Sequence, residues 1–275
     1  MGDLTRVENN NLSFSNWSAS SGLSWTPRQC WNFKLNLSRS FRVPNQAELF
    51  INGVHHGTFR HEMGDASLQS EIGYQADATV LYELKQFYVK VSPYFNYFNG
   101  YIYLRPTAQF STLPDGGQVY QYSQHDAIFA GSEFYIEWHP VKQIHMEYMI
   151  DGVYTYNLNT GLALPFTPPV RGRFQLEYEK DFDKRYLSEM AVGGNYLVWS
   201  SQNRVDRNEH ATSGAFTVDL FLKMEFKEDG ASLNFQFNNI FNRYYLNHLS
   251  AYRALNIPQQ GRNFTIMLNL PFGKK

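Results

Sequence analysis

Apolar and polar residues alternate with a period of two in two runs near the end of the chain. The apolar members are Leu233, Phe235 and Phe237 in the first run, then Phe264, Ile266, Leu268, Leu270 and Phe272 in the second. Successive side chains of a strand point to opposite faces, so each run predicts a strand with one apolar and one polar face. The apolar face would meet another sheet in a soluble sandwich, or lipid in an outer-membrane barrel. The near-terminal aromatic Phe272 favours the barrel.

The same alternation extends along the whole chain and predicts eleven strands. They are expected near Leu12–Trp25, Trp31–Phe41, Ile72–Leu84, Phe87–Tyr103, Gln118–His139, Gln143–Tyr156, Arg171–Glu179, Tyr186–Trp199, Phe216–Phe226 and the two runs above. In the ninth strand we expect Leu220 and Leu222 on the apolar face. Asp219 and Lys223 should lie on the polar face. The fourth strand has Pro93 on one face, although proline lacks a backbone N–H and is normally confined to an edge strand or a bulge.

Short and long connections alternate between the predicted strands. The short ones are Pro27–Cys30, Lys85–Gln86, Pro140–Lys142, Lys180–Arg185 and Lys227–Gly230. The long ones are Arg42–Glu71, Leu104–Gly117, Asn157–Val170, Ser200–Ser213 and Asn239–Arg262. Outer-membrane barrels have this pattern, with short periplasmic turns and long extracellular loops. We therefore predict an all-β, antiparallel, up-and-down transmembrane β-barrel rather than a Greek-key sandwich, whose long connections are irregularly placed.

The strand number and the N-terminus predict that only part of a barrel is present. Bacterial single-chain barrels have an even number of strands, whereas the pattern gives eleven. The segment Met1–Asn9 lacks the apolar core of a signal peptide, although an outer-membrane protein must be exported. Residues 1–275 are therefore expected to form an incomplete part of a larger barrel.

Composition is consistent with this prediction. The net charge of −1 gives no indication of a nucleic-acid partner. Mean hydropathy is −0.45 and there is no apolar run of about 18 residues, so no transmembrane helix is predicted. The 17% aromatic content suits a lipid-facing surface with interfacial aromatic belts. Cys30 is the one cysteine, so an intrachain disulfide and a cysteine-based metal cluster are both excluded.

Three stretches match segments that characterise a known class of barrel. They are Ser38–Pro44 (SRSFRVP) with Glu48–Phe50 (ELF), the following loop Gly53–Glu71, and Asn239–Phe264 (beginning NIFN) with Phe272. Together they resemble the C-terminal half of a TonB-dependent outer-membrane receptor, and the closing hairpin is the most specific part. The resemblance implies a barrel of about 22 strands around an N-terminal plug domain. The plug, the segment that contacts TonB and the first half of the barrel have no counterpart in this sequence.

The resemblance also implies a function. It implies active uptake of a scarce nutrient, with energy relayed by the TonB complex through the plug. The expected cargo is a metal ion or a metal chelate: zinc, copper or an iron–siderophore. The expected partners are outer-membrane lipid, TonB and that small-molecule or metal substrate, with no covalently bound cofactor.

Three other functions compete with this one. They are a passive porin-like channel, which is the main alternative, a rim-mounted outer-membrane enzyme and a soluble β-sandwich binding module. An enzyme is not predicted, because the sequence has no Gly-x-Ser-x-Gly, His-Glu-x-x-His, P-loop or Cys-x-x-Cys motif. A plug and TonB-contacting segment upstream would separate the receptor from the porin.

The loop Arg42–Glu71 carries a candidate metal site. Within eleven residues it holds His55, His56, His61, Glu62 and Asp65. Imidazoles and carboxylates are suitable ligands for Zn²⁺, Cu²⁺ or Ni²⁺. The competing interpretation is a solvated loop whose histidines form local hydrogen bonds, and the spacing alone favours that interpretation.

The last long connection carries candidate substrate contacts. They are Tyr244, Tyr245, His248, Tyr252 and Arg253, to which we add Arg42 at the start of the histidine-containing loop. Tyrosine and arginine make good contacts to organic chelators. They also anchor barrels at the level of the lipid headgroups, and this second role is the favoured interpretation.

Overall fold

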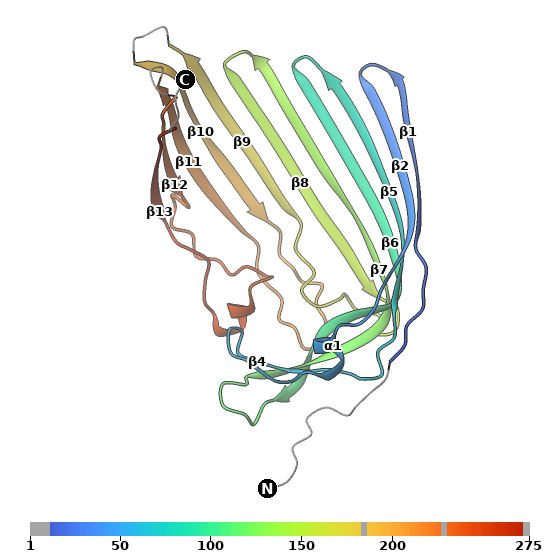
Figure 1. Cartoon of the computed structure of the whole chain (residues 1–275). Helices are drawn as coiled ribbons and strands as arrows, with labels where there is room; N and C mark the ends of the chain where they lie inside the picture. Colours follow the sequence, from blue (N-terminus) through green and yellow to red (C-terminus); the bar gives the residue numbers. More distant parts are fainter. Residues whose placement is uncertain (1–11, 183–185, 227–229, 272–275) are drawn as a thin grey trace.

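The structure is a computed structural model that describes residues 12–182, 186–226 and 230–271. It contains one open sheet in which eleven strands follow each other in chain order (Figure 1). In sheet order they are β1 (Ala19–Arg28), β2 (Trp31–Arg42), β5 (Glu71–Leu84), β6 (Phe87–Phe110), β7 (Gln118–Val141), β8 (Ile144–Asn157), β9 (Arg171–Asp181), β10 (Leu187–Trp199), β11 (Ala215–Phe226), β12 (Ser232–Asn238) and β13 (Asn263–Asn269). The predicted eleven-stranded antiparallel meander, an unclosed part of a barrel, is confirmed.

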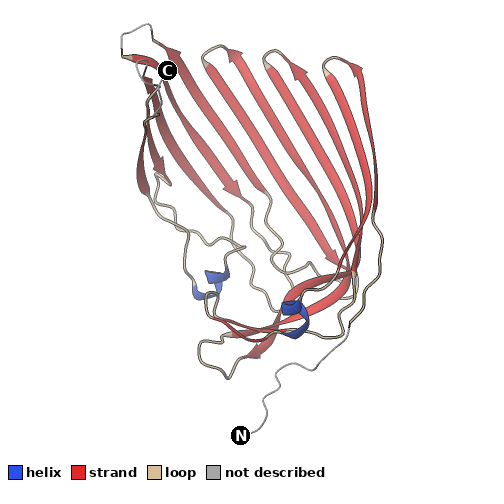
Figure 2. Cartoon of the chain, in the orientation of Figure 1, coloured by secondary structure: helices blue, strands red, loops and turns tan. Residues whose placement is uncertain are grey.

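The remaining elements of the described chain are small and lie at the end of the sheet that carries the long connections (Figures 1 and 2). They are the hairpin of β3 (Asn52–His55) and β4 (Arg60–Met63), the helix α1 (Gln46–Phe50) and the 3-10 helix η1 (Ala251–Leu255). The predicted first strand is shorter than expected, because residues 12–18 precede β1 as irregular chain. Met1–Asn9 and Phe272 lie outside the described residues.

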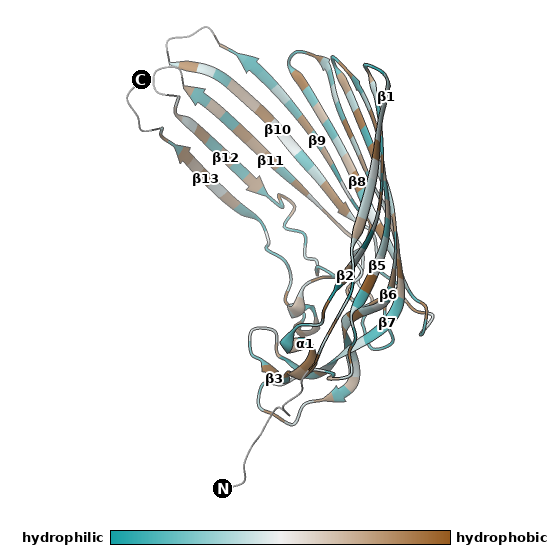
Figure 3. Ribbon diagram, turned by 45° about the vertical axis from the view of Figure 1, so that its right-hand side comes forward, coloured by the Kyte–Doolittle hydropathy of each residue, from teal (hydrophilic) through white to brown (hydrophobic). Residues whose placement is uncertain are grey.

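Hydrophobic and hydrophilic residues alternate along the strands (Figure 3), so the two faces of the sheet differ in polarity. On the apolar face, the Leu220 side chain is 46% exposed. On the polar face, Lys223 forms an ion pair with Glu177 (N–O distance 3.1 Å), and Arg173 forms one with Glu147 (2.7 Å). Glu177 of β9 pairs with Gly193 of β10, and Ala191, two residues before Gly193, pairs with Lys223 of β11. Glu177 and Lys223 therefore lie on the same face of the sheet, on either side of β10. The predicted faces of the ninth strand are therefore confirmed.

Pro93 lies inside β6, between β5 and β7, and not at an edge. It pairs with Ser132 of β7. On the other side, the recorded pairs with β5 stop at Asp77–Tyr94 and resume at Val80–Val91 without a change of register. The missing N–H thus interrupts the ladder with β5 without bending the strand out of the sheet, and the predicted fourth strand is confirmed.

The connection predicted at Leu104–Gly117 is shorter than expected, because β6 continues through its first half to Phe110, while β7 begins at Gln118. Each strand has 24 residues, against the roughly 9–11 that cross a bilayer. Gly100 and Pro106 resemble strand breakers, but register shifts between Phe98 and Tyr101 and between Pro106 and Phe110 accommodate them as irregularities. The long ends of β6 and β7 therefore extend beneath the other strands toward the loops (Figure 1).

The segment between β2 and β5 is an ordered unit that packs on β6. Asn45 and Glu48 form a capping box that starts α1. Leu49 of α1 and Leu68 pack with Ile102 of β6 in a buried cluster. Strand β4 then pairs in parallel with the start of β7, in the register Arg60–Gln118. This unit closes one side of the loop region.

Candidate functional site

A cavity of about 580 Å³ lies among the loops at the long-connection end of the sheet. Its walls come from the start of β7, the β10–β11 loop and the β12–β13 loop. Residues that line it include Gln118, Tyr120, Asn208, His210, Tyr244 and Tyr245. A volume of this size is typical of pockets for small organic ligands. We call it the mouth cavity.

One buried carboxylate joins the loops around the mouth cavity. The Glu209 side chain is 2% exposed. Its oxygens accept hydrogen bonds from Arg253 Nη2 (3.1 Å) and from the backbone N–H groups of Phe166 (3.0 Å) and Asp206 (3.3 Å). The β8–β9, β10–β11 and β12–β13 loops therefore meet at this single group.

Hydrogen bonding stabilises the charged form of Glu209. Burial alone would raise the pKa of its carboxyl group. The close contact with His248 and the hydrogen bonds from Phe166 N–H and Arg253 outweigh burial and leave the pKa below its ordinary value. Glu209 is thus an ionised anchor for the Arg253 guanidinium.

His248 completes this network from the side away from solvent, with a side chain 1% exposed. Its Nδ1 lies 2.8 Å from Thr212 Oγ1 and also accepts a hydrogen bond from Arg253. Because a guanidinium group only donates, the proton of a neutral His248 ring resides on Nε2. That nitrogen lies 3.2 Å from Glu209 Oε1, within range of an ionic contact but off the direction of a hydrogen bond.

Three of the predicted substrate contacts line the mouth cavity: Tyr244, Tyr245 and Arg253. The Tyr245 ring stacks on Trp199 of β10, with centroids 5.1 Å apart, and burial raises the pKa of its phenol. The Tyr244 hydroxyl donates to the backbone oxygen of Asn256 (3.2 Å). These contacts hold both tyrosines against the loops.

The other predicted substrate contacts have structural partners elsewhere. Tyr252 donates its hydroxyl to the backbone oxygen of Gly57 (2.8 Å), which links the β12–β13 loop to the β3–β4 hairpin. Arg42 donates to both carboxylate oxygens of Glu48 (2.8 Å each) and to Glu71 (3.1 Å). Arg42 does not line the mouth cavity.

The structure does not bring the predicted metal-binding histidines together. In the β3–β4 hairpin His55 pairs with Arg60 and Val54 with His61, so alternation places His55 and His61 on opposite faces. Both ring nitrogens of His61 have partners, Ser111 Oγ (2.8 Å) and Asn52 Oδ1 (2.9 Å). His55 Nδ1 lies 3.2 Å from Thr58 Oγ1.

The remaining candidate ligands do not form a cluster either. The Asp65 carboxylate caps Ser67, accepting from its N–H (2.8 Å) and its hydroxyl (2.6 Å). Within ranges 12–182, 186–226 and 230–271, one group of three His, Cys, Asp or Glu side chains has its ligand atoms within 4.8 Å of each other. That group is Glu179, Asp181 and Glu189, at the short-turn end, and it contains neither His56 nor Glu62.

Sequence analysis missed an aromatic patch next to the mouth cavity. A second cavity of about 330 Å³ is lined by Arg60, Tyr101, Tyr103 and Phe129. The Arg60 guanidinium carbon lies 4.5 Å from the centroid of Tyr120 and 4.8 Å from that of Phe166. Tyr101 and Tyr103 lie two residues apart at the end of the predicted strand Phe87–Tyr103, and this spacing was the available signal for them. The convergence of Arg60 and Phe166 depends on loop packing, for which the sequence has no signal.

A family model described as TonB dependent receptor-like, beta-barrel matches residues 2–240. The chain belongs to this family. No curated protein matches it. TonB-dependent receptor barrels lie in the outer membrane, so the apolar face of this sheet faces lipid and the long connections are extracellular. The family is one of receptors and not of enzymes.

Solved structures of this family share the fold. The copper transporter OprC superimposes with a TM-score of 0.79 at 18% identity, over 93% of this chain and 39% of that one. A ferric enterobactin receptor (PfeA) mutant from Pseudomonas aeruginosa gives 0.65 at 16% identity, over 94% and 40%. The FrpB iron transporter from Neisseria meningitidis gives 0.66 at 16%, over 93% and 38%. The chain thus spans about two fifths of the length of these structures.

No helix of the described residues is long and apolar enough to cross a membrane.

Proposed function

We propose that this chain is the C-terminal part of a receptor that takes up a metal chelate across the outer membrane by TonB-dependent transport. The mouth cavity contacts the organic shell of the chelate on the extracellular side. Energy from the TonB complex reaches the cargo through a plug domain, which has no counterpart in these 275 residues. Family membership supports uptake of a metal or a metal chelate, as does the similarity to the copper transporter OprC and to the ferric enterobactin receptor PfeA.

The residues that line the mouth cavity favour a chelate over a bare ion as the cargo. Its lining combines the phenols of Tyr120 and Tyr244 with the amides of Gln118 and Asn208. Such groups stack on and hydrogen-bond to an organic molecule. The anionic Glu209 is already neutralised by Arg253, and no cluster of metal ligands lies at the cavity within the described part of the chain. The cavity is therefore suited to an organic surface.

The test uses the full-length receptor and a panel of ferric siderophores, with free Cu²⁺ and Zn²⁺ for comparison. We expect one siderophore to bind, and the Y244A/H210A double variant to weaken its binding about tenfold, a loss of about 1.4 kcal/mol. A matched control is Y178A/H56A. Tyr178 lies on the apolar face of β9 and His56 in the loop between β3 and β4, and neither lines the cavity.

Three results would overturn parts of the proposal. Binding of free Cu²⁺ or Zn²⁺ that Y244A/H210A weakens, with no siderophore bound, would make the cargo a bare ion. Uptake that continues at the same rate in cells lacking TonB would identify the passive porin-like channel instead. Unchanged siderophore binding in Y244A/H210A would remove the mouth cavity from the pathway.

A further inference from the structure

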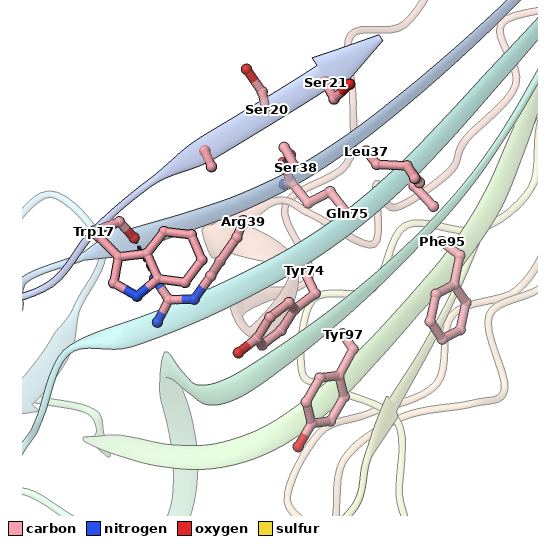
Figure 4. Close-up of a pocket in the computed structure, with 12 residues that line it drawn as sticks. Trp17, Ser20, Ser21, Leu37, Ser38, Arg39, Tyr74, Gln75, Phe95 and Tyr97 are labelled. Carbon is pink, nitrogen blue, oxygen red and sulfur yellow. Dashed lines mark hydrogen bonds between the residues drawn. The ribbon is translucent and has the colours of Figure 1, made fainter. Parts of the chain in front are cut away.

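A groove of about 490 Å³ lies on the lipid-facing side of the sheet, where β1, β2, β5 and β6 approach the extracellular end (Figure 4). Residues that line it include Trp17, Ala19, Leu37, Arg39, Tyr74 and Phe95. Leu37 pairs with Ala76 and Ala76 with Phe95, so these three side chains share the apolar face. Arg39 and Tyr74 form the next pair on that face. The groove therefore opens to the bilayer and not to the lumen.

Arg39 is an unusual residue for this surface. Its guanidinium carbon lies 4.1 Å from the centroid of Trp17 and 5.8 Å from that of Tyr74. The guanidinium group donates to Asn16 Oδ1 (3.0 Å) and to the backbone oxygen of Trp17. These two bonds leave further N–H groups available among the five that arginine carries. No carboxylate of the described residues forms an ion pair with Arg39.

The depth of Arg39 corresponds to the headgroup region of the outer leaflet. It lies three residues before the extracellular end of β2 at Arg42, which is about 10 Å along a strand. Trp17, Tyr74 and Tyr97 surround it, as in the aromatic belt of a barrel (Figure 4). Leu37 and Phe95 lie one side-chain repeat deeper. The groove thus has a cationic, aromatic upper end and an apolar lower end.

We propose that this groove binds a phosphorylated glycolipid of the outer leaflet. A phosphate group accepts hydrogen bonds from the free edge of the Arg39 guanidinium, and an acyl chain lies over Leu37, Ala76 and Phe95. The guanidinium group has the charge opposite to that of phosphate, and its planar fork of N–H donors can bind two phosphate oxygens at once. Asp126 on the neighbouring β7 does not oppose the phosphate directly, because its carboxylate accepts from the Tyr97 hydroxyl (3.2 Å) and from Gly100 N–H (2.9 Å).

The test measures lipid retained by the purified full-length receptor, using bisphosphorylated lipid A as the probe and native mass spectrometry as the readout. We expect R39Q to reduce the retained lipid A about tenfold, equivalent to about 1.4 kcal/mol. The amount of lipid A retained by R39K should lie between that of R39Q and that of the parent, because lysine keeps the positive charge but cannot donate two parallel hydrogen bonds as a guanidinium does. R28Q is the matched control, because Arg28 is on the same hairpin at the periplasmic end.

Two lipid comparisons test the chemistry without any variant. Lipid A stripped of its phosphates should be retained about tenfold less by the parent receptor, and phosphatidylglycerol should not displace bisphosphorylated lipid A. Equal retention by R39Q, an equal loss in R28Q, or equal binding of the stripped lipid would overturn the proposal. Displacement by phosphatidylglycerol would overturn the choice of a glycolipid. Heat-modifiable migration of each variant confirms that it is folded.

Discussion

The two longest extracellular loops are each organised around an arginine held by carboxylates, but they recruit those carboxylates differently. In the β2–β5 loop, Arg42 binds Glu48 and Glu71, which are 6 and 29 residues away in the chain. In the β12–β13 loop, Arg253 binds Glu209 from the preceding loop, 44 residues away. The first loop is thus stabilised by residues at its own two ends. The second is stabilised by a carboxylate from a neighbouring loop.

This difference separates a loop that packs on β6 from a loop that lines the mouth cavity. The β2–β5 loop has a helix with a capping box and an apolar cluster with Ile102, so it packs against β6. The β12–β13 loop joins two others around Glu209 and leaves the mouth cavity between them. A site enclosed by several loops can change its lining by the movement of any one of them. We therefore expect the two loops to respond differently when their arginine clusters are broken.

The largest effect is expected for E209A. The substitution leaves the buried Arg253 guanidinium without its counter-ion and the N–H groups of Phe166 and Asp206 without an acceptor. Removing one partner of a buried ion pair costs about 3–5 kcal/mol. Hydrogen exchange of the full-length receptor should show loss of protection in the β8–β9, β10–β11 and β12–β13 loops together, and siderophore binding should weaken.

The matched control for E209A is E62Q in the β3–β4 hairpin. Among the described residues, Glu62 forms no recorded ion pair, so its loss should leave all loops protected. Protection of the β12–β13 loop in E209A equal to that in the parent would show that Glu209 does not join these loops.

A smaller effect is expected for R42Q. The Arg42 side chain is 41% exposed, so water replaces part of what Glu48 and Glu71 lose. Glu71 keeps its bond from Ile102 N–H (2.9 Å) and Glu48 its bond from Asn45 N–H (2.8 Å). We expect a local cost of about 1–2 kcal/mol, seen as faster exchange in residues 43–70. Loosening of the β12–β13 loop by the same amount would contradict the separation of the two loops.

The wall of the barrel was predictable because strands obey a strict period. The alternation of the closing strands is kept in β12 and β13, where Leu233, Phe235 and Phe237 pair with Leu268, Ile266 and Phe264 on one face. Lipid on one side and a polar lumen on the other enforce that rule over eleven strands. The rule fails where local irregularities are tolerated, as at Gly100 and Pro106 in β6. The resemblance rested most on the closing hairpin, whereas the family match ends at residue 240.

The mouth was predictable only in part, because loop contacts are not periodic. Tyr244, Tyr245 and Arg253 could be chosen by residue type, and they do line the cavity. Glu209 could not, since its importance depends on Phe166 N–H and Arg253 arriving from two other loops. The histidine cluster shows the limit of arguing from sequence spacing alone. Nearness in sequence suggested convergence, but two of its members lie in a hairpin whose alternation separates them.

The smallest effect is expected for H55A/H61A. If the hairpin captured Zn²⁺ or Cu²⁺, the double variant would bind metal at least about tenfold more weakly, a loss of about 1.4 kcal/mol. Affinity in the parent would also fall as pH drops through about 6.5, where imidazole becomes protonated and cannot ligate. His55 and His61 lie on opposite faces of the hairpin, so we expect neither the loss of affinity nor this pH dependence. We expect the affinities for metal and for siderophore to stay within about twofold of the parent, a change in binding free energy below about 0.5 kcal/mol. A loss of metal affinity of about tenfold would instead identify the hairpin as the capture site.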